Sequence, residues 1–256
     1  MKKILLTAAM LLAHPLFAAE KLRIGIEGEY PPFSAVDAQG QLHGFDVDIA
    51  LALCAEMQRD CELVQTAWDG LIPSLNSQKI DAIVASMSAT EERRQSVDFT
   101  EKYYANAGKF VLAQGAAEGI AADNWRESLK GKTLGVQRAT IHDRYASETA
   151  KDIFADIRRY NTQEEANLDL VAGRIDVSLA DQTALASGFL ASADGKGFAL
   201  AAPVINDPAF YGEGVSIAIR KGDDALRDSL NTAIRAIRAN GEYQKINSKY
   251  FDFDIY

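Results

Sequence analysis

The chain has 256 residues, which is enough for one large domain or two of about 120 residues, and 48% of them are hydrophobic and 25% charged. The 27 Lys+Arg residues against 36 Asp+Glu residues give a formal net charge of −9, so the chain as a whole repels a phosphate backbone and we expect no nucleic-acid binding. Two cysteines are too few for a disulfide-framework miniprotein, and three histidines leave little material for a soft-metal site.

The first residues have the parts of a secretory signal peptide. Met1–Lys3 is a basic start, Ile4–Ala13 is an apolar run, and Leu16–Ala19 offers a small residue for cleavage. The apolar run is too short to span about 30 Å of hydrocarbon, and Pro15 would break a longer helix. We therefore expect a signal peptide of residues 1–18, with cleavage after Ala19 as an alternative, and an exported chain.

Export determines whether the two cysteines are expected to form a disulfide. Cys54 and Cys61 are seven positions apart, on a predicted connection between a helix and a strand. In an oxidising compartment they could close a small loop, whereas a cytosolic protein would keep them as buried thiols. We expect the disulfide, with a stabilisation of roughly 2–3 kcal/mol on the chain-entropy model.

Strands and helices alternate from Leu22 onwards. The first series comprises a strand, a helix capped by Asp46, an extended segment, a helix and a buried strand: Leu22–Ile26, Asp46–Cys54, Cys61–Val64, Trp68–Ser77 and Ile80–Ala85. The second series repeats this order: Thr133–Val136, a helix from about Thr140, Ile157–Tyr160, Thr162–Ala172 and Ile175–Leu179.

The two series are alike in detail. Lys79–Ile83 in the first resembles Arg174–Ser178 in the second, about 95 residues later. We expect two similar α/β lobes; the alternative is a single sheet that reuses a common pattern. Because no long Pro- or Ser-rich linker separates the series, the connection must be short strands such as Tyr104–Ala113.

The chain closes with a strand and a long helix. Gly212–Gly214 precedes the strand Val215–Arg220, and an amphipathic helix is predicted over Asp223–Tyr250. The predicted buried face of that helix consists of Ala225, Leu226, Leu230, Ile234 and Ile237.

Polar residues stand just after the predicted buried strands, where open α/β sheets collect ligands. They are Glu27, Tyr30, Ser86, Ser88, Arg93, Thr140 and Asp181. A buried acid such as Asp181 needs a cationic partner, and a helix start such as Thr140 offers N–H groups to an anion. Simpler roles stay open: solvated helix charges for Arg93 and Arg94, and capping for Thr140 and Asp181. No nucleophile elbow, phosphate loop, dinucleotide fingerprint or His-rich metal spacing occurs.

Several blocks together resemble the periplasmic polar amino-acid-binding proteins of ABC importers, solute-binding protein family 3. The closest resemblance is to the lysine/arginine/ornithine and histidine binders, and it runs from about Leu22 to Tyr256. The blocks are Ile24–Phe33, Gly44–Asp48, Trp68–Leu75, Asp98–Thr100 and Lys249–Asp254. The Cys54/Cys61 pair also matches the disulfide of those binders.

The resemblance implies an α/β, type II periplasmic binding protein with two hinge-connected lobes, each a mixed sheet flanked by helices. Residues 19–105 would form the first segment of lobe 1 and residues 106–204 would form lobe 2. Residues 205–256 would return to lobe 1 and end in the C-terminal helix.

The resemblance also implies roles for single residues. Arg93 would grip a ligand α-carboxylate with Ser88 and the N–H groups near Thr140, and Asp181 would hold the α-ammonium with Ser86. Tyr30 and Trp68 would sandwich the ligand side chain, and Glu27 would face its distal cation. The chain departs from the family pattern at Ala85, Gln137, Arg138, Ile141 and His142.

The implied function is an exported binder that captures a basic L-amino acid by lobe closure and delivers it to a membrane ABC permease. We rank arginine first, then ornithine and lysine, then histidine, and expect a periplasmic monomer without cofactor, metal or catalysis. One alternative is an opine or other polar amino-acid binder, although opine binders lose the acid that stands here as Asp181. The other is an exported cyclohexadienyl dehydratase on the same fold, which acts on prephenate or arogenate and needs a positioned proton donor.

Overall fold

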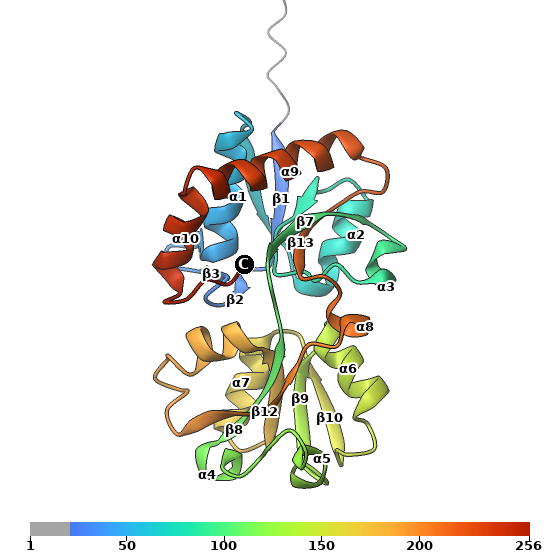
Figure 1. The fold of residues 1–256 in the computed structure, drawn as a ribbon, viewed down its shortest axis with the longest axis vertical. Helices are drawn as coiled ribbons and strands as arrows, with labels where there is room; N and C mark the ends of the chain where they lie inside the picture. Colours follow the sequence, from blue (N-terminus) through green and yellow to red (C-terminus); the bar gives the residue numbers. More distant parts are fainter. Residues whose placement is uncertain (1–20) are drawn as a thin grey trace, which may run out of the picture.

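A computed structural model describes residues 21–256, and the predicted signal peptide, residues 1–18, lies outside the described residues. The first of its two large sheets has the strand order β5-β1-β6-β13-β7 (Figure 1). β1 is parallel to β5 and β6, whereas β13 is antiparallel to β6 and β7. The strands are β1 (Leu22–Ile26), β5 (Cys61–Gln65), β6 (Ala82–Ile83), β7 (Asp98–Tyr104) and β13 (Val215–Ile219).

The second sheet repeats this arrangement, with the order β10-β9-β11-β8-β12. β9 is parallel to β10 and β11, whereas β8 is antiparallel to β11 and β12. The strands are β8 (Gly108–Ala113), β9 (Thr133–Gln137), β10 (Asp156–Tyr160), β11 (Val177–Asp181) and β12 (Phe198–Ile205). Two mixed sheets confirm the two-lobe α/β prediction, and the single-sheet alternative is wrong.

Helices flank both sheets and supply the rest of each core. With the first sheet lie α1 (Phe45–Glu56), the 3-10 helix η1 (Trp68–Gly70), α2 (Leu71–Asn76), α3 (Glu91–Arg94), α9 (Asp224–Ala239) and α10 (Glu242–Tyr250). A three-stranded antiparallel sheet joins this lobe: β2 (Glu29–Tyr30), β3 (Ser34–Val36) and β4 (Leu42–His43). With the second sheet lie α4 (Gln114–Ala117), α5 (Trp125–Ser128), α6 (Ile141–Thr149), α7 (Gln163–Val171), the π-helical turn η2 (Ala184–Phe189) and α8 (Pro208–Tyr211). None of the helices in residues 21–256 combines the length and apolar character needed to cross a bilayer.

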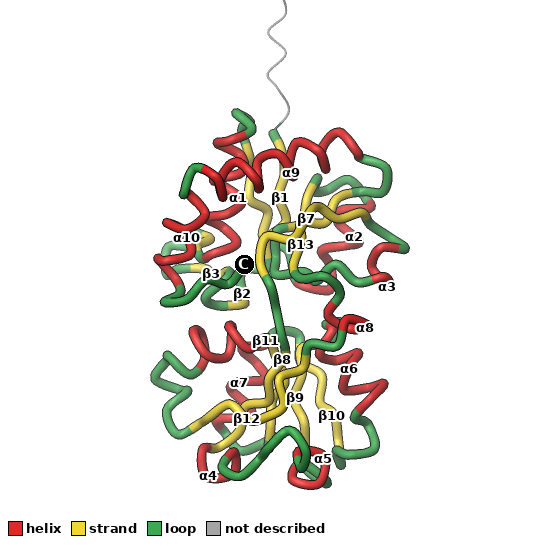
Figure 2. The backbone as a smooth tube through the Cα atoms, viewed as in Figure 1, coloured by secondary structure: helices red, strands yellow, loops and turns green. Residues whose placement is uncertain are grey.

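The chain passes between the sheets twice, and Figure 2 shows both passages as segments that connect the two halves. The first is the short stretch 105–107 between β7 and β8, and the second runs from β12 through α8 to β13. As a result β13, α9 and α10 pack with the N-terminal sheet, where Ile217, Ile234 and Tyr243 share one apolar core with Ile24 and Ile49. Both halves of the first lobe are therefore held together by burial of apolar surface.

The predicted C-terminal helix Asp223–Tyr250 is wrong in one respect, because it consists of the two helices α9 and α10. The break is at Gly241, whose φ of +87° is a left-handed conformation that glycine adopts without steric cost. Leu226, Leu230, Ile234 and Ile237 form the buried face of α9 as predicted, but Ala225 is exposed.

The start of α1 also differs from the prediction. Asp46 does not cap this helix: the cap position is Gly44, with a φ of +127°, and a Cβ atom there would lie 2.4 Å from the carbonyl oxygen of Phe33. Glycine is required by this close approach of two backbone segments. Asp46 lies one residue inside the helix and is fully buried.

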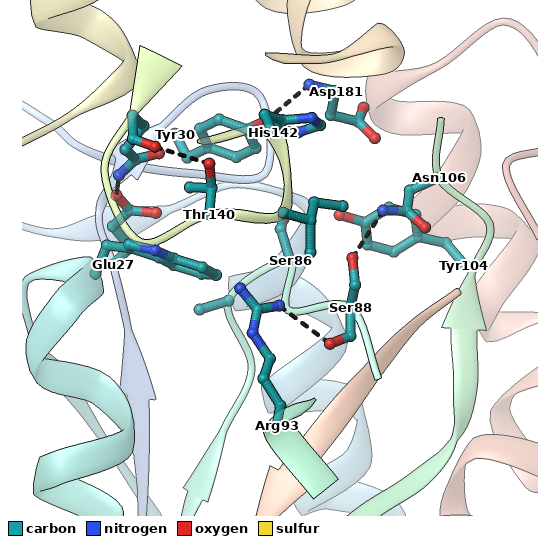
Figure 3. Close-up of a pocket in the computed structure, with 14 residues that line it drawn as sticks. Glu27, Tyr30, Ser86, Ser88, Arg93, Tyr104, Asn106, Thr140, His142 and Asp181 are labelled. Atoms are coloured by element: carbon teal, nitrogen blue, oxygen red, sulfur yellow. Dashed lines mark hydrogen bonds between the residues drawn. The ribbon is translucent and has the colours of Figure 1, made fainter. Parts of the chain in front are cut away.

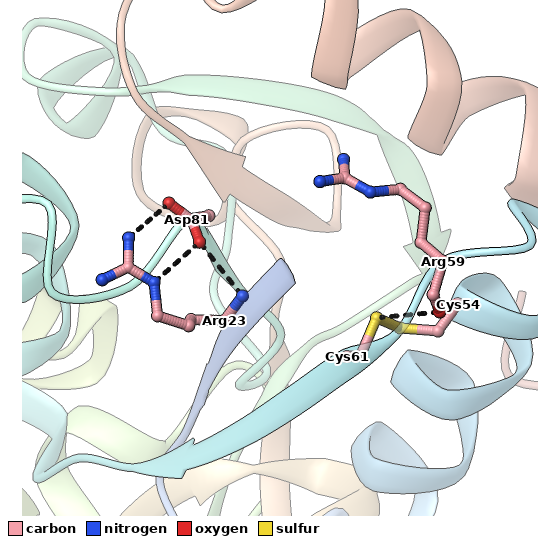
Figure 4. The surroundings of a disulfide bond; sticks show 5 residues. All are labelled: Arg23, Cys54, Arg59, Cys61 and Asp81. Atoms are coloured by element: carbon pink, nitrogen blue, oxygen red, sulfur yellow. Dashed lines mark hydrogen bonds and ion pairs between the residues drawn. A yellow bond between two sulfur atoms is a disulfide. The ribbon is translucent and has the colours of Figure 1, made fainter. Parts of the chain in front are cut away.

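The predicted disulfide is confirmed. Cys54 of α1 and Cys61 at the start of β5 are joined, with an S–S distance of 1.97 Å (Figure 4). On the neighbouring strand β1, Arg23 donates two side-chain hydrogen bonds of 3.0 and 2.9 Å to Asp81. The disulfide closes the turn between helix and strand, while the ion pair ties β1 to the segment that enters β6.

Candidate functional site

A cavity that is partly open to solvent lies between the two lobes (Figure 3). The structure brings all eight predicted site residues to its wall: Glu27, Tyr30, Trp68, Ser86, Ser88, Arg93, Thr140 and Asp181. The other lining residues are Ala85, Tyr104, Asn106, Gln137, Ile141 and His142. The lining residues lie at the ends of strands and the starts of helices in both lobes, and in the passage between β7 and β8. Ligand sites of open α/β sheets are commonly built at strand ends in this way.

Arg93 occupies one end of the cavity. It lies on α3, a short helix capped by Thr90, whose hydroxyl accepts a hydrogen bond from the Arg93 backbone N–H at 3.3 Å. Its Nη1 donates to the carbonyl of Ser88 at 3.0 Å, and its guanidinium lies 5.2 Å from the Trp68 ring centre. Burial lowers the pKa of Arg93 to about 10. Within residues 21–256 no carboxylate forms an ion pair with this guanidinium, although the nearby charge of Glu92 raises its pKa.

The N-terminus of α6 faces the same region. Thr140 caps it: its Oγ1 accepts from the N–H of Asp143 at 3.2 Å and donates to the carbonyl of Gln137 at 2.7 Å. The Thr140 hydroxyl therefore acts as a helix cap, which was the simpler role expected for this residue. The N–H groups of the first helical residues, Ile141 and His142, have no partner within a helix and are available to an anion.

His142 contributes a neutral ring to this wall. Its Nδ1 lies 2.9 Å from the hydroxyl of Tyr211, and burial together with nearby Arg93 lowers its pKa to about 3. The imidazole therefore adds no positive charge.

Asp181 marks the opposite wall. It is the last residue of β11, only 4% exposed, and its Oδ1 accepts from the N–H groups of Thr183 at 2.7 Å and Ala184 at 3.1 Å. These bonds make it a cap for the following turn, as the simpler interpretation expected. Burial nevertheless raises the pKa of Asp181 to about 6, since no cationic side chain of residues 21–256 pairs with it.

Ser86 lies between Asp181 and Arg93 in the wall, and a buried cluster fixes its position (Figure 3). Its φ of +54° is rare for a serine, and its Oγ donates to Oδ2 of Asp46 at 2.9 Å. Oδ1 of Asp46 accepts from the Tyr103 hydroxyl at 2.8 Å. Burial raises the pKa of Asp46 to about 7, although the bonds from Tyr103 and Ser86 lower it.

Glu27 lies at the remaining end, after β1. It is 3% exposed, and its Oε1 accepts a 2.5 Å hydrogen bond from Nε2 of Gln137, which belongs to the other lobe. Burial raises the pKa of Glu27 to about 7, and the bond from Gln137 lowers it. With Asp181 in the wall and Asp46 behind Ser86, buried carboxylates outnumber the one guanidinium of the wall, an environment that favours a ligand with excess positive charge.

Polar contacts join the two lobes around the cavity. The partners include Glu27 and Gln137, Tyr30 and Asp181, Trp68 and Ala139, Arg93 and Ala139, Asp69 and Arg138, and Glu92 and Arg144. In two of them Trp68 Nε1 donates to the carbonyl of Ala139 at 3.1 Å, and Asp69 pairs with Arg138 at 2.7 Å. The structure is thus in a closed arrangement.

Three wall residues had no signal in the strand–helix pattern. Tyr104 is the last residue of β7 and Asn106 lies in the first passage between the lobes, where the sequence indicated only a connection. Asn106 donates from Nδ2 to Oγ of Ser88 at 2.8 Å, which orients the serine hydroxyl. In the sequence, Gln137 stands out only as a departure from the family pattern. Its bond to Glu27 depends on how two lobes meet, so no local sequence feature could have predicted it.

Comparison with known proteins identifies the family. The model of bacterial extracellular solute-binding proteins, family 3, matches residues 22–253. The L-arginine-binding protein of Pseudomonas aeruginosa is 50% identical, covering 100% of this chain and 99% of that protein. The histidine-binding periplasmic protein of Salmonella typhimurium is 40% identical with the same coverage.

Solved structures agree with this assignment. A Salmonella typhimurium periplasmic binding protein described for its high arginine specificity has a TM-score of 0.81 and 33% identity, covering 91% of this chain and 100% of that one. An ancestral amino-acid-binding protein described as a precursor of cyclohexadienyl dehydratase has a TM-score of 0.79 and 29% identity, covering 91% and 96%. The chain belongs to the bacterial extracellular solute-binding proteins of family 3.

Proposed function

We propose that this protein captures a basic L-amino acid in the periplasm, arginine before ornithine and lysine and these before histidine, and delivers it to an ABC permease. One observation carries the proposal: the inter-lobe cavity has an unpaired guanidinium at Arg93 and buried, cation-free carboxylates at Asp181 and Glu27. Buried charges need partners, and a basic amino acid supplies all three. The arginine- and histidine-binding relatives support the same ligand class.

Each end of the ligand has a counterpart in the wall. The α-carboxylate takes two hydrogen bonds from the fork of Arg93, with the Ser88 hydroxyl and the N–H groups after Thr140 as further donors. The α-ammonium faces Asp181, with Ser86 as its neighbour. The side chain lies between the rings of Tyr30 and Trp68 and ends at Glu27. Hinge bending at the two passages between the sheets, residues 105–107 and the segment from β12 through α8 to β13, opens and closes the site.

We further propose that the protein is a monomer that binds without catalysis. A dehydratase needs an acid beside the leaving hydroxyl of prephenate, and Glu27 is the one acid of the cavity at the side-chain end. Its Oε1 accepts the bond from Gln137, and prephenate lacks the α-ammonium that we assign to Asp181, although arogenate carries one. The signal peptide and the absence of nucleic-acid binding stay predictions.

A ligand screen tests this proposal. The mature protein is unfolded, refolded to remove copurified ligand, and its melting temperature is measured with each of the twenty amino acids, ornithine, citrulline, octopine and prephenate. A ligand at 100 times its Kd adds about 2.7 kcal/mol to the free energy of unfolding, and at one common concentration the ligand with the lowest Kd adds the most, so arginine should give the largest shift. A response to octopine alone, or turnover of prephenate to phenylpyruvate, would refute the proposal.

A further inference from the structure

The side chain of Gln137 reaches from the second lobe to the distal end of the cavity and is held there firmly. It is the last residue of β9 and 3% exposed. Its Nε2 donates to Oε1 of Glu27 at 2.5 Å and to the carbonyl of Asn161 at 3.2 Å. Both N–H bonds of the amide are therefore in use, which fixes the orientation of the amide plane.

The two hydrogen bonds leave one particular atom of the amide unused. Among residues 21–256 no donor contacts Gln137 Oε1, and none contacts Oε2 of Glu27. Because the amide and the carboxylate are joined through Nε2 and Oε1, these two acceptor oxygens lie at the same end of the cavity, one from each lobe. Trp68 and Tyr30 line the cavity beside them.

We infer that Gln137 is a specificity-determining residue that selects a guanidinium over an ammonium at the distal end of the ligand. Its amide oxygen accepts one guanidinium N–H while Glu27 accepts another, so the flat group is held from both lobes. This inference rests on the proposed function and names the group that the distal subsite recognises.

The geometry of the two cations gives the reason. A guanidinium is planar, carries five N–H donors in fixed directions, is weakly hydrated and stacks on aromatic rings. It can therefore satisfy two separate acceptors at once. An ammonium is compact and strongly hydrated, and ornithine and lysine would meet Glu27 but gain less from a second, neutral acceptor. Removing that acceptor should cost arginine more than lysine.

A purely structural role for Gln137 makes a different prediction. If the amide only donates a hydrogen bond to Glu27 or holds the lobes closed, the binding of every ligand depends on it equally. The ratio of the lysine Kd to the arginine Kd separates the two roles, because a change in closure cancels in the ratio.

The test is calorimetry of the refolded protein with arginine, lysine and ornithine, on the wild type and on Gln137→Met, a near-isosteric apolar substitution. We expect Gln137→Met to weaken arginine at least tenfold and lysine less than threefold. Gln137→Asn, which keeps the amide but withdraws it, should give an intermediate ratio. Gln39→Met in an exposed turn is the control and should leave all three constants unchanged.

The outcomes separate the inference from the proposed function. Parallel losses for arginine and lysine, or a wild type that binds both equally well, would overturn the role of Gln137 while leaving basic amino-acid binding intact. A wild type that binds none of the three would instead refute the proposed function. If Gln137→Met does not fold, as judged by its melting transition, the Gln137→Asn ratio decides.

Discussion

Replacement of Arg93 by alanine should nearly abolish binding of every amino acid, because all of them share the α-carboxylate. The guanidinium contacts two carbonyl oxygens and the Trp68 ring, and no carboxylate of residues 21–256 forms an ion pair with it, so a bound carboxylate becomes its direct counter-charge. Breaking a buried pair by removing one partner costs about 3–5 kcal/mol. At 1.4 kcal/mol for each factor of ten, this corresponds to a loss of affinity of roughly 100-fold to several thousand-fold.

Isothermal titration with arginine measures this loss, and the adjacent arginine provides a matched control. Arg94 is on the same short helix but contacts Glu91 and the Phe99 ring and does not line the cavity. Arg94→Ala should therefore bind within about twofold of the wild type, while Arg93→Lys, which keeps the charge but loses the planar fork, should fall between them. An Arg93→Ala protein with affinity within threefold of the wild type would refute the assignment of the carboxylate subsite.

Three further predictions concern charge and covalent structure. Glu27→Gln should weaken arginine and ornithine by more than ~1.5 kcal/mol and citrulline far less, since only a cation loses its counter-charge; equal losses in calorimetry would reject this role. Burial raises the pKa of Asp46 from 3.8 to about 7 in the folded state, so the stability that its proton provides is complete below about pH 4 and is lost as the pH rises to about 7. Asp46→Asn should accordingly reduce the decline in unfolding free energy between pH 4 and pH 7 in urea titrations, and an unchanged decline would contradict this cause. Replacing Cys54 and Cys61 by serine should lower the unfolding free energy by roughly 2–3 kcal/mol and leave the arginine Kd unchanged, which calorimetry on the folded variant checks.

The architecture could be predicted from the sequence because each strand–helix unit has a local signal. The strands Leu22–Ile26 and Thr133–Gln137 alternate with helical segments, so both lobes followed from periodicity, and polar residues after the strands, such as Glu27 and Thr140, indicated the edge where ligands bind. Errors arose where tertiary contacts outweigh a local rule. Asp46 is a residue type that often caps helices, but it lies inside α1 and accepts hydrogen bonds from Tyr103 and Ser86.

The candidate site was predictable only in part, and for a different reason. Arg93 and Asp181 stand beside recognisable helix and strand ends, and the family resemblance gave each a role. Asn106 and Gln137 act through partners more than fifteen residues away in sequence, Ser88 and Glu27. Such pairs arise from the closed arrangement of two lobes, which residue patterns within one segment do not encode.

The central claim is that a basic amino acid is captured by closure of the two lobes, and small-angle X-ray scattering tests it most directly. The refolded protein is measured without ligand and with saturating arginine. We expect arginine to reduce the radius of gyration and to bring the scattering profile into agreement with the closed structure, in which Trp68 contacts Ala139 and Asp69 pairs with Arg138. An identical profile with and without arginine, at a concentration where calorimetry shows the site to be filled, would contradict capture by closure.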